Sequence, residues 1–370
     1  MKTIPTDAMI RAAVARFSSV GEIRSYQRLE TGHINDTYVL TTTEGKFLLQ
    51  RLSPIAFKDP IKVMENIIGV THFLNLRIQA EGGDPLRECL NLVQNDDGDF
   101  YEIDEEGYCW RIYLFIEGKT FDMPENPEQF RLAAEAFGRF QYLLTEYPSQ
   151  TLHETIPHFH DTPKRFKDFE AAVKADKKGR VATCQGIIQE AFDRKDKINV
   201  IVDGLKSGSL PLRTTHNDTK LNNVMFDSTG TKPLAILDLD TVMPGSALYD
   251  FGDSIRFGAN TCLEDEKDTA KIHFSLPMFE AYAKGFVHGA NHSLTEHEIR
   301  LFPYAGWLMT YECGIRFLAD YLEGDIYFHV AYPEHNLVRA LDQFALLKDM
   351  EAHKAEADEV IVQLLQEENS

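Results

Sequence analysis

Hydrophobic and polar residues follow two different periods along this chain of 370 residues. From residue 26 to residue 52 apolar and polar positions alternate, as they do in strands that bury one face. Turn residues at 31–35 and 42–46 divide this stretch into antiparallel strands. The elements predicted in this part are helices at 6–17 and 63–76 and strands at 36–41, 47–52, 89–93, 100–103 and 108–115.

The period changes to that of α-helices after the segment Ile116-Glu117-Gly118. Asn126 followed by Pro127 is a helix start, because the asparagine can cap the helix and proline suits its first position. Further starts are predicted at Thr162 and at Thr295. We therefore expect an α+β chain with two lobes: a small antiparallel sheet with a helix over 1–116, and a larger, mostly helical lobe over 117–370.

Composition narrows the classes of partner. The formal net charge of −20 opposes binding to nucleic acid or to anionic lipid, so neither is expected as a partner, and a monomer is expected. No signal-peptide or membrane-spanning stretch is predicted. The odd number of cysteines favours a reducing cytoplasm. The five are far apart: Cys89, Cys109, Cys184, Cys262 and Cys313.

The most informative motif is His216-x-Asp218-x-x-x-x-Asn223, followed by an apolar strand that ends at Asp238. In this spacing an aspartate can accept the proton of a substrate hydroxyl, and the asparagine oxygen can face Mg²⁺. Asp238 then provides a second oxygen ligand for the metal. Either segment alone is also explained by turn closure or helix capping. Both together, in this order, favour phosphoryl transfer.

The same segments, with Asp250-Phe251-Gly252-Asp253, resemble the aminoglycoside phosphotransferase and choline kinase-like superfamily. Asn217 stands where protein kinases usually have a basic residue, which is similar to the small-molecule branch. The resemblance implies a bilobal protein kinase-like fold. It also implies that Asp250 supports the catalytic loop through its backbone or through His216.

Longer strings resemble the N-acetylhexosamine 1-kinases. They include GHIN at 32–35, IPHFHDTP at 156–163, ECGIRFLADYLEGDIYF at 312–328 and YPEHNLVR at 332–339. This resemblance implies magnesium-dependent transfer of the γ-phosphate of ATP to the anomeric hydroxyl of N-acetylglucosamine or N-acetylgalactosamine. Asp218 would be the base and would orient the sugar oxygen, with Asn223 and Asp238 as the Mg²⁺ ligands.

The resemblance also assigns residues to the nucleotide. Gly32, Asn35 and Thr37 would form a turn over the phosphates, because glycine lets backbone N–H groups approach phosphate oxygens. The nucleotide base would contact the segment around Phe115 and Glu117, largely through the backbone.

Four further residues are assigned to the sugar. His33 would bond the substrate, although an exposed turn histidine is the alternative. Asp240 would assist the metal or a substrate hydroxyl, with a turn-forming role as the alternative. Arg316 and Tyr327 would contact the sugar, although Arg316 also has the spacing of an ion pair with Glu312 or with Asp320.

One departure from the superfamily pattern concerns the strand at 47–52. The basic residue expected to reach the phosphates is replaced by Gln50 when the apolar pattern sets the register. Arg51 would serve only if the strand slipped, and Glu65 is the one obvious ion-pair candidate on the next helix. Phosphate binding is therefore expected to depend on Mg²⁺ and on backbone donors.

Other functions remain open from the sequence. A kinase of another small alcohol, such as an aminoglycoside, homoserine, choline or methylthioribose, has the same catalytic motif. A nucleotide-binding pseudokinase is suggested by the missing basic residue, and the intact acidic motif argues against it. A metal cluster at His158, His160 and Asp161 is disfavoured, since Thr162-Pro163 marks a helix start there.

Overall fold

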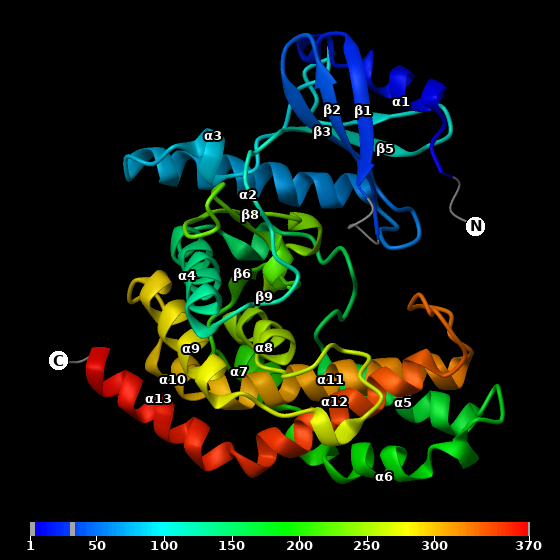
Figure 1. Ribbon diagram of the computed structural model, residues 1–370, viewed down its shortest axis with the longest axis vertical. Helices are drawn as coiled ribbons and strands as arrows, with labels where there is room; N and C mark the ends of the chain where they lie inside the picture. Colours follow the sequence, from blue (N-terminus) through cyan, green and yellow to red (C-terminus); the bar gives the residue numbers. More distant parts are fainter. Residues whose placement is uncertain (1–3, 30–33, 369–370) are drawn as a thin grey trace. The chain divides into compact units, whose positions relative to one another are not determined.

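The computed structural model describes residues 4–29 and 34–368, which divide into two units by their contacts (Figure 1). The first unit comprises Met1–Lys119, Glu146–Ile156 and Met225–Met243. The second comprises Thr120–Thr145, Pro157–Val224 and Pro244–Ser370. The chain therefore returns twice to the first unit after residue 119, which a single boundary after residue 116 does not describe.

An antiparallel five-stranded sheet forms the centre of the first unit, in the order β1-β2-β3-β5-β4. Its strands are β1 (Ile23–Leu29), β2 (Asp36–Thr42), β3 (Lys46–Arg51), β4 (Glu102–Ile103) and β5 (Cys109–Leu114). Helix α1 (Asp7–Val14), capped by Thr6, buries its apolar side on one face of the sheet. Alternate positions of β2, β3 and β5 form this core, among them Leu40, Leu49 and Ile112.

The opposite face of the sheet belongs to helix α2 (Pro60–Ala80), whose Met64 contacts Arg111 of β5. Asp59 caps α2, and Pro60 occupies its first turn. The strand predicted at 89–93 is wrong: the short helix α3 (Pro85–Glu88) precedes this stretch, and only Leu92 forms an isolated bridge, to Tyr113. Capping by Asp84 with Pro85 explains the turn of helix.

The last segment of the first unit contains two short strands. Strands β7 (Val224–Phe226) and β8 (Pro233–Ile236) pair with each other. The backbones of Lys119 and Phe226 exchange two hydrogen bonds of 2.9 and 2.8 Å. This approach requires Gly118, since a Cβ there would lie 2.1 Å from the carbonyl oxygen of Phe226.

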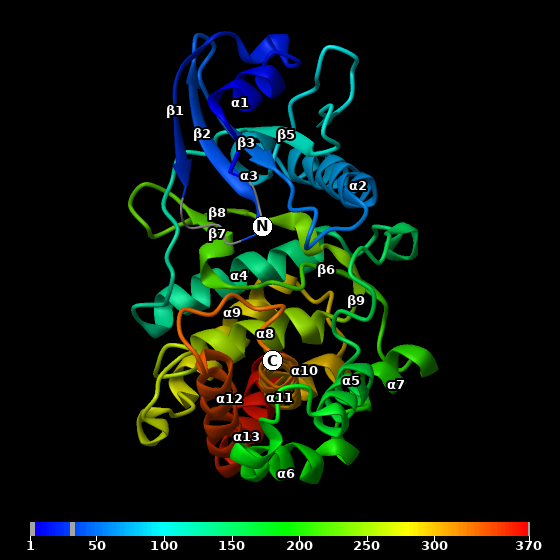
Figure 2. The same ribbon diagram turned by 90° about the vertical axis from the view of Figure 1, so that its right-hand side faces the viewer.

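The second unit is mostly helical (Figures 1 and 2). Its helices are α4 (Pro127–Leu143), α5 (Thr162–Ala175), α6 (Gln185–Asp193), α7 (Val200–Ser207), α8 (Ala247–Gly258), α9 (Leu276–Ala290), α10 (Glu296–Arg300), α11 (Phe302–Glu323), α12 (His335–Ala352) and α13 (Lys354–Glu368). Helix α4 packs along α9, and α11 packs against α5, α8 and α12. Strand β6 (Arg213–Thr215) pairs with β9 (Met243–Gly245). These observations confirm the predicted α+β class with a sheet-bearing first part and a mostly helical second part.

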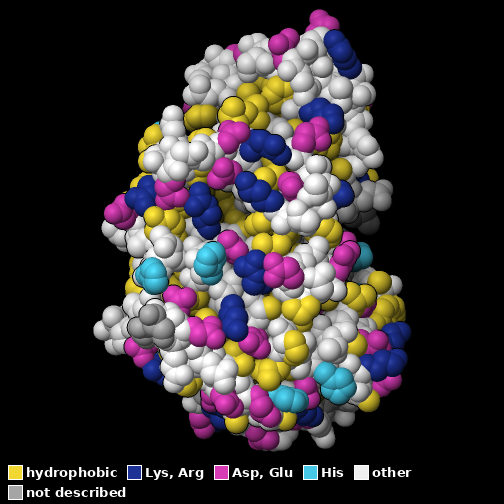
Figure 3. Space-filling model, turned by 60° about the vertical axis from the view of Figure 1, so that its left-hand side comes forward, with side chains coloured by type: hydrophobic (Ala, Val, Ile, Leu, Met, Phe, Trp, Pro, Cys, Tyr) yellow, Lys and Arg dark blue, Asp and Glu magenta, His cyan; other side chains and the backbone are white. Residues whose placement is uncertain are grey.

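The surface carries charges of both signs. On the face shown in Figure 3, lysine and arginine side chains are mixed with aspartate and glutamate, and histidines are scattered among them. Within residues 4–29 and 34–368, no helix combines the length and the apolar character that crossing a lipid bilayer requires.

Candidate active site

The loop after β6 carries the predicted base. Asp218 lies between β6 and a 3₁₀ turn, η5 (Leu221–Asn223), and its side chain is 27% exposed. The preceding Asn217 adopts a left-handed backbone with φ of 66°, a conformation that asparagine tolerates better than most residues. The loop thus presents an accessible carboxylate directly after a strained residue, and such strain requires support from the surroundings.

Asp250 supplies that support from the first turn of α8. Its buried carboxylate accepts hydrogen bonds from the backbone N–H groups of His216 at 3.0 Å and Asn217 at 2.7 Å. Gln141 of α4 donates a third, at 2.8 Å. Burial raises the pKa of Asp250 although His216 and these donors oppose the shift. The prediction that Asp250 bonds the backbone of this loop is confirmed.

The next turn of α8 fixes the other side of the loop. The backbone N–H of Thr219 donates to Asp253 at 3.2 Å, and the hydroxyl of Ser254 donates to the carbonyl of Thr219 at 2.6 Å. Arg256 pairs with Asp253 at 2.9 Å inside the unit. Asp218 is therefore placed between two anchored stretches of backbone, which limits the directions that its carboxylate can take.

Asn223 and Lys220 both contact Asp218. The Asn223 amide nitrogen donates to the Asp218 carbonyl at 2.8 Å and to its Oδ2 at 3.2 Å. In the described part of the chain these bonds use Nδ2 alone, so Oδ1 of Asn223 keeps its acceptor capacity for a cation. Lys220 Nζ lies 3.1 Å from Oδ1 of Asp218, and this carboxylate raises the pKa of Lys220.

Lys220 was not among the residues predicted from the sequence. Its position two residues after the predicted base was the available signal, since a cation there is within reach of the same carboxylate.

The other predicted metal ligand, Asp238, lies in the first unit. It follows β8 and precedes the 3₁₀ turn η6 (Leu239–Thr241). Asp238 has a left-handed backbone with φ of 54°, and it is exposed to solvent. Carboxylate oxygens are among the ligands that Mg²⁺ prefers, so Asp238 has the chemistry of a magnesium ligand. Its role as a metal ligand stays a prediction.

Asp240, two residues later, is buried and fully engaged within the first unit. Its Oδ1 accepts a hydrogen bond from Arg111 at 2.5 Å, and its Oδ2 accepts one from Asn35 at 2.6 Å. Asn35 also accepts the backbone N–H of Ser53 at 3.0 Å. The carboxylate therefore ties the segment after β8 to the sheet. Its predicted contact with metal or substrate stays a prediction.

Arg111 of β5 is a buried cation on the face of the sheet that helix α2 covers. It pairs in register with Gln50 of β3, and its Nε and Nη2 donate to the Gln50 amide oxygen at 3.0 and 2.8 Å. Gln50 donates in turn to Thr37 at 3.2 Å. Burial alone would lower the pKa of Arg111, but Asp240 raises it above its ordinary value.

Arg111 was not predicted, because the basic residue was expected on the strand at 47–52. The signal was a charged residue within the apolar run Cys109-Trp110-Arg111-Ile112-Tyr113-Leu114, where an uncompensated charge would be costly.

Arg51 points to the other face of the sheet, as the apolar register predicted. Its guanidinium pairs with buried Asp36 at 2.8 Å and stacks on Tyr108, 4.3 Å from the ring centroid. Glu65 on α2, the other candidate, pairs with His153 at 2.6 Å. The predicted register of β3 is confirmed, with Gln50 and Arg51 on opposite faces of the sheet. That Gln50 stands in place of a phosphate-binding basic residue stays a prediction.

The residues predicted at the nucleotide base follow β5. Glu117 pairs with Lys46 at 2.7 Å, and Lys46 Nζ lies 5.5 Å from the ring centroid of Phe115. Gly32 and His33, predicted at the phosphates and the sugar, lie outside the described residues.

Arg316 and Tyr327, predicted at the sugar, come together in the second unit. The guanidinium carbon of Arg316 lies 5.9 Å from the Tyr327 ring centroid and 5.3 Å from that of Phe159. Of the alternative ion pairs, Glu312 lies 4.0 Å away, while Asp320 accepts the backbone N–H of Tyr327 at 2.8 Å. Arg316 is thus held mainly by aromatic rings.

Glu312 bonds instead to two residues of the segment that contains His158 and His160. It accepts from Thr162 at 2.6 Å and bonds His160 at 2.8 Å. Burial would raise the pKa of Glu312, but His160, Arg316 and these bonds hold it below its ordinary value. Among the described residues no group of three or more His, Cys, Asp or Glu side chains has a metal-binding arrangement.

Residues 25–284 match the model of the phosphotransferase enzyme family. Among solved structures, the chain resembles an aminoglycoside phosphotransferase from Alicyclobacillus acidocaldarius, with 15% identity, coverage of 99% of this chain and 97% of that one, and a TM-score of 0.56. A microcompartment-associated aminopropanol kinase has 13% identity, coverage of 95% and 99%, and a TM-score of 0.60. A spectinomycin phosphotransferase in complex with ADP and spectinomycin has 14% identity, coverage of 99% and 100%, and a TM-score of 0.54.

Proposed function

The chain belongs to the phosphotransferase enzyme family, and from this premise we propose that it is an N-acetylhexosamine 1-kinase. The reaction transfers the γ-phosphate of ATP to the anomeric hydroxyl of N-acetylglucosamine or N-acetylgalactosamine. One observation carries the proposal: the loop that presents Asp218 and Asn223 is held by Asp250 through two backbone hydrogen bonds. The bound ADP of the spectinomycin enzyme supports a purine nucleotide as co-substrate.

Asp218 accepts the proton of the sugar O1 hydroxyl and orients that oxygen toward the γ-phosphorus. An anomeric hydroxyl is more acidic than an ordinary alcohol, and a loose transition state needs little proton removal early in the reaction. Asp218 therefore needs a fixed direction more than a high basicity, and its anchored loop supplies that direction.

Asn223 and Asp238 would each bind Mg²⁺ through side-chain oxygens, and the bound ion would supply positive charge to offset the phosphate oxygens. Asn223 Nδ2 remains on Asp218, which leaves Oδ1 for this task.

Lys220 is the cation that complements the phosphates in this proposal, and Arg111 acts indirectly. Lys220 lies 3.1 Å from Asp218 and restrains the carboxylate in the absence of substrate; its ammonium group is a donor for a transferring phosphoryl oxygen. Arg111 acts through Asp240: it fixes the segment that begins at Asp238, and Gln50 shares this task. In this proposal Arg111 and Gln50 together substitute for the basic residue that the superfamily pattern places at position 50.

The sugar is recognised in the second unit by Arg316 and Tyr327. An arginine fork can bond two neighbouring hydroxyls or an amide oxygen, and an aromatic ring packs on a pyranose face. His33 adds a further contact in this proposal. Asp240 was expected to contact substrate or metal. In this proposal its main role is the hydrogen bond with Arg111, and a contact with substrate or metal comes second. The free cysteines accord with a cytoplasmic enzyme.

A second candidate is a kinase of a cationic alcohol. It is favoured by the aminopropanol kinase and the spectinomycin phosphotransferase among similar structures. The sequence strings around Arg316 and Tyr327 favour the acetylated sugar instead. Arg316 also places a positive charge where a cationic substrate would be repelled.

The test is ADP release with Mg²⁺ and ATP in the presence of N-acetylglucosamine, N-acetylgalactosamine, aminopropanol, spectinomycin or choline. We expect turnover with the two sugars, and a product that resists borohydride because its reducing end carries the phosphate. Turnover with a cationic alcohol alone would establish the second candidate. Tight ATP binding without turnover on any of them would indicate a pseudokinase.

Asp218→Asn provides the mechanistic check in the same assay. We expect kcat to fall by about a thousandfold or more, since proton acceptance and orientation are both lost. Asp203→Asn, at an exposed position of α7, is the matched control and should retain full activity. An Asp218→Asn activity within about tenfold of wild type, equal to about 1.4 kcal/mol, would contradict the assigned role.

A further inference from the structure

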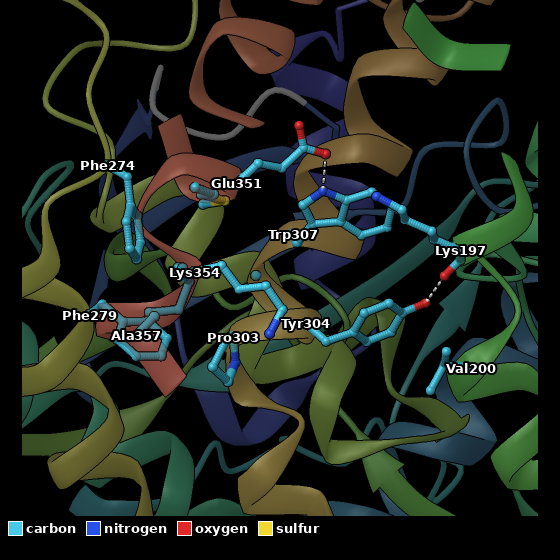
Figure 4. A pocket seen from close by; sticks show the side chains of 13 residues that line it. Lys197, Val200, Phe274, Phe279, Pro303, Tyr304, Trp307, Glu351, Lys354 and Ala357 are labelled. Carbon is cyan, nitrogen blue, oxygen red and sulfur yellow. Dashed lines mark hydrogen bonds between the residues drawn. The ribbon is translucent and has the colours of Figure 1, made fainter. Parts of the chain in front are cut away.

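A cavity of about 320 Å³ opens in the second unit, where α11, the start of α13 and the end of α12 meet (Figure 4). Its walls are largely apolar and include Phe274, Phe279, Tyr304, Trp307 and Met350. Protein interiors rarely leave a void larger than a water molecule, whereas pockets for small molecules begin at about 300 Å³. Its size and lining are therefore those of a binding pocket for a small molecule.

The aromatic wall offers ring surface and few polar atoms. Trp307 stacks between Tyr304 and Tyr311, at centroid distances of 5.8 and 5.6 Å. The indole N–H donates to Glu351 at 3.0 Å, and the Tyr304 hydroxyl donates to the backbone carbonyl of Lys197 at 2.6 Å (Figure 4). Since the polar atoms of both rings are already bonded, this wall can receive only an apolar body.

The charges at the cavity do not cancel. Glu351 is neutralised by Arg194, which donates to it at 2.9 and 2.7 Å. Lys354 pairs with Asp358 on α13. Lys197 has a different environment: its side chain is exposed, its Nζ lies 6.0 Å from the Trp307 ring centroid, and its charge helps to lower the pKa of Glu351. No carboxylate in the described ranges lies within ion-pair distance of it, so an ammonium group without a close ion-pair partner lies at an apolar pocket.

We propose that this cavity binds an apolar carboxylate, a molecule with a hydrocarbon body and one anionic end. The body lies against Trp307, Phe274 and Met350, and the carboxylate pairs with Lys197. An apolar pocket with a lysine ammonium group at its wall selects this class, because burial of the hydrocarbon is favourable and an ion pair would fix the orientation of the molecule. The proposal involves neither Asp218 nor ATP and does not rest on the proposed function.

Calorimetric titration of the full chain with decanoate tests the proposal, with decanol and decyltrimethylammonium as probes of the same length and different charge. We expect one saturable site that binds decanoate more tightly than decanol, and the cation least. Lys197→Met should weaken decanoate binding about tenfold and leave decanol unchanged. Lys195→Met, on the same 3₁₀ turn, is the matched control and should change neither.

Ala357→Phe fills the cavity from α13, and Ala352→Phe adds the same ring at an exposed position of α12. The first should abolish binding of decanoate and decanol, the second should not, and thermal unfolding of both establishes that they are folded. Several results would overturn the proposal: no saturable binding, equal affinity for the three charges, a Lys197→Met variant that binds decanoate like wild type, or a folded Ala357→Phe variant that still binds it.

Discussion

At the scale of single residues, Arg111 shows how one strand can supply a group that its neighbour lacks. Gln50 occupies the register position where the superfamily pattern places a cation, and the side chain opposite it on β5 is an arginine. Arg111 is buried, and the buried carboxylate of Asp240 balances its charge. Because a buried ion pair contributes little net stability but is costly to break, its removal has a distinctive signature.

We predict that Arg111→Met lowers the free energy of unfolding by about 3 to 5 kcal/mol, since Asp240 is left as an unpaired buried charge. The double variant Arg111→Met with Asp240→Asn should recover a large part of that loss. Urea unfolding of the four proteins of this double-mutant cycle measures the coupling. The double variant should nevertheless have a raised KM for magnesium-ATP, because Asp238 loses its anchored neighbour. Equal stability of the single and double variants would refute the coupling.

Asp342 on α12 gives a prediction about pH. Its side chain is buried, its Oδ2 has no hydrogen-bond partner in the described part of the chain, and burial raises its pKa to about 7. Between pH 4 and pH 7 the unfolded state loses this proton and the folded state keeps it, so stability falls as pH rises through this window.

Asp342→Asn cannot ionise, so it should flatten this part of the pH dependence. We expect the variant to be more stable than wild type at pH 8, by on the order of 2 to 4 kcal/mol, and to lose the advantage near pH 4. Urea unfolding at pH 4, 6 and 8 measures the difference, with exposed Asp203→Asn as the control. A difference that does not vary with pH would rule out the raised pKa.

At the scale of elements, the backbone contact between Lys119 and Phe226 depends on a residue without a side chain. Gly118→Ala would place Cβ 2.1 Å from the carbonyl oxygen of Phe226, and one of the two segments must move. We predict a loss of about 1 to 3 kcal/mol in the free energy of unfolding. Gly186→Ala, in α6 with open space around the new Cβ, should be neutral or stabilising by up to about 1 kcal/mol. Similar effects of the two substitutions would show that the contact is not tight.

Elements with local signals were predicted well from the sequence. Asn126 and Pro127 begin α4, and Thr295 and Glu298 form the expected capping box of α10. These signals need only neighbouring residues, so no tertiary information was required. The stretch 89–93 has an apolar run but not enough partners for a strand, and only the fold decides that.

The candidate site divides in the same way. The spacing of His216, Asp218 and Asn223 identified the loop, and Asp250 was correctly expected to support it. The bond of Arg111 to Asp240 joins residues 129 positions apart, which no local pattern encodes. Lys220 lay inside the motif but had no assigned role until its distance to Asp218 was known.

At the scale of the whole molecule, the first unit is built from three separate stretches of chain. We predict that a fragment of residues 1–119 does not fold, since Arg111 would lack Asp240 and Lys119 would lack Phe226. Joining this fragment through glycine-serine linkers to residues 146–156 and 225–243 should restore a cooperative urea transition followed by circular dichroism. A cooperative transition in the 1–119 fragment alone would show that the later stretches are dispensable.

The chain passes from one unit to the other after Lys119, Thr145, Ile156, Val224 and Met243. No single break in the chain separates the two units, so neither can be exchanged between related proteins as one continuous segment. New acceptor specificity in this fold is then expected to arise from substitutions at single positions. Libraries aimed at altered substrates should therefore randomise the amino acids at chosen positions rather than exchange segments of the chain.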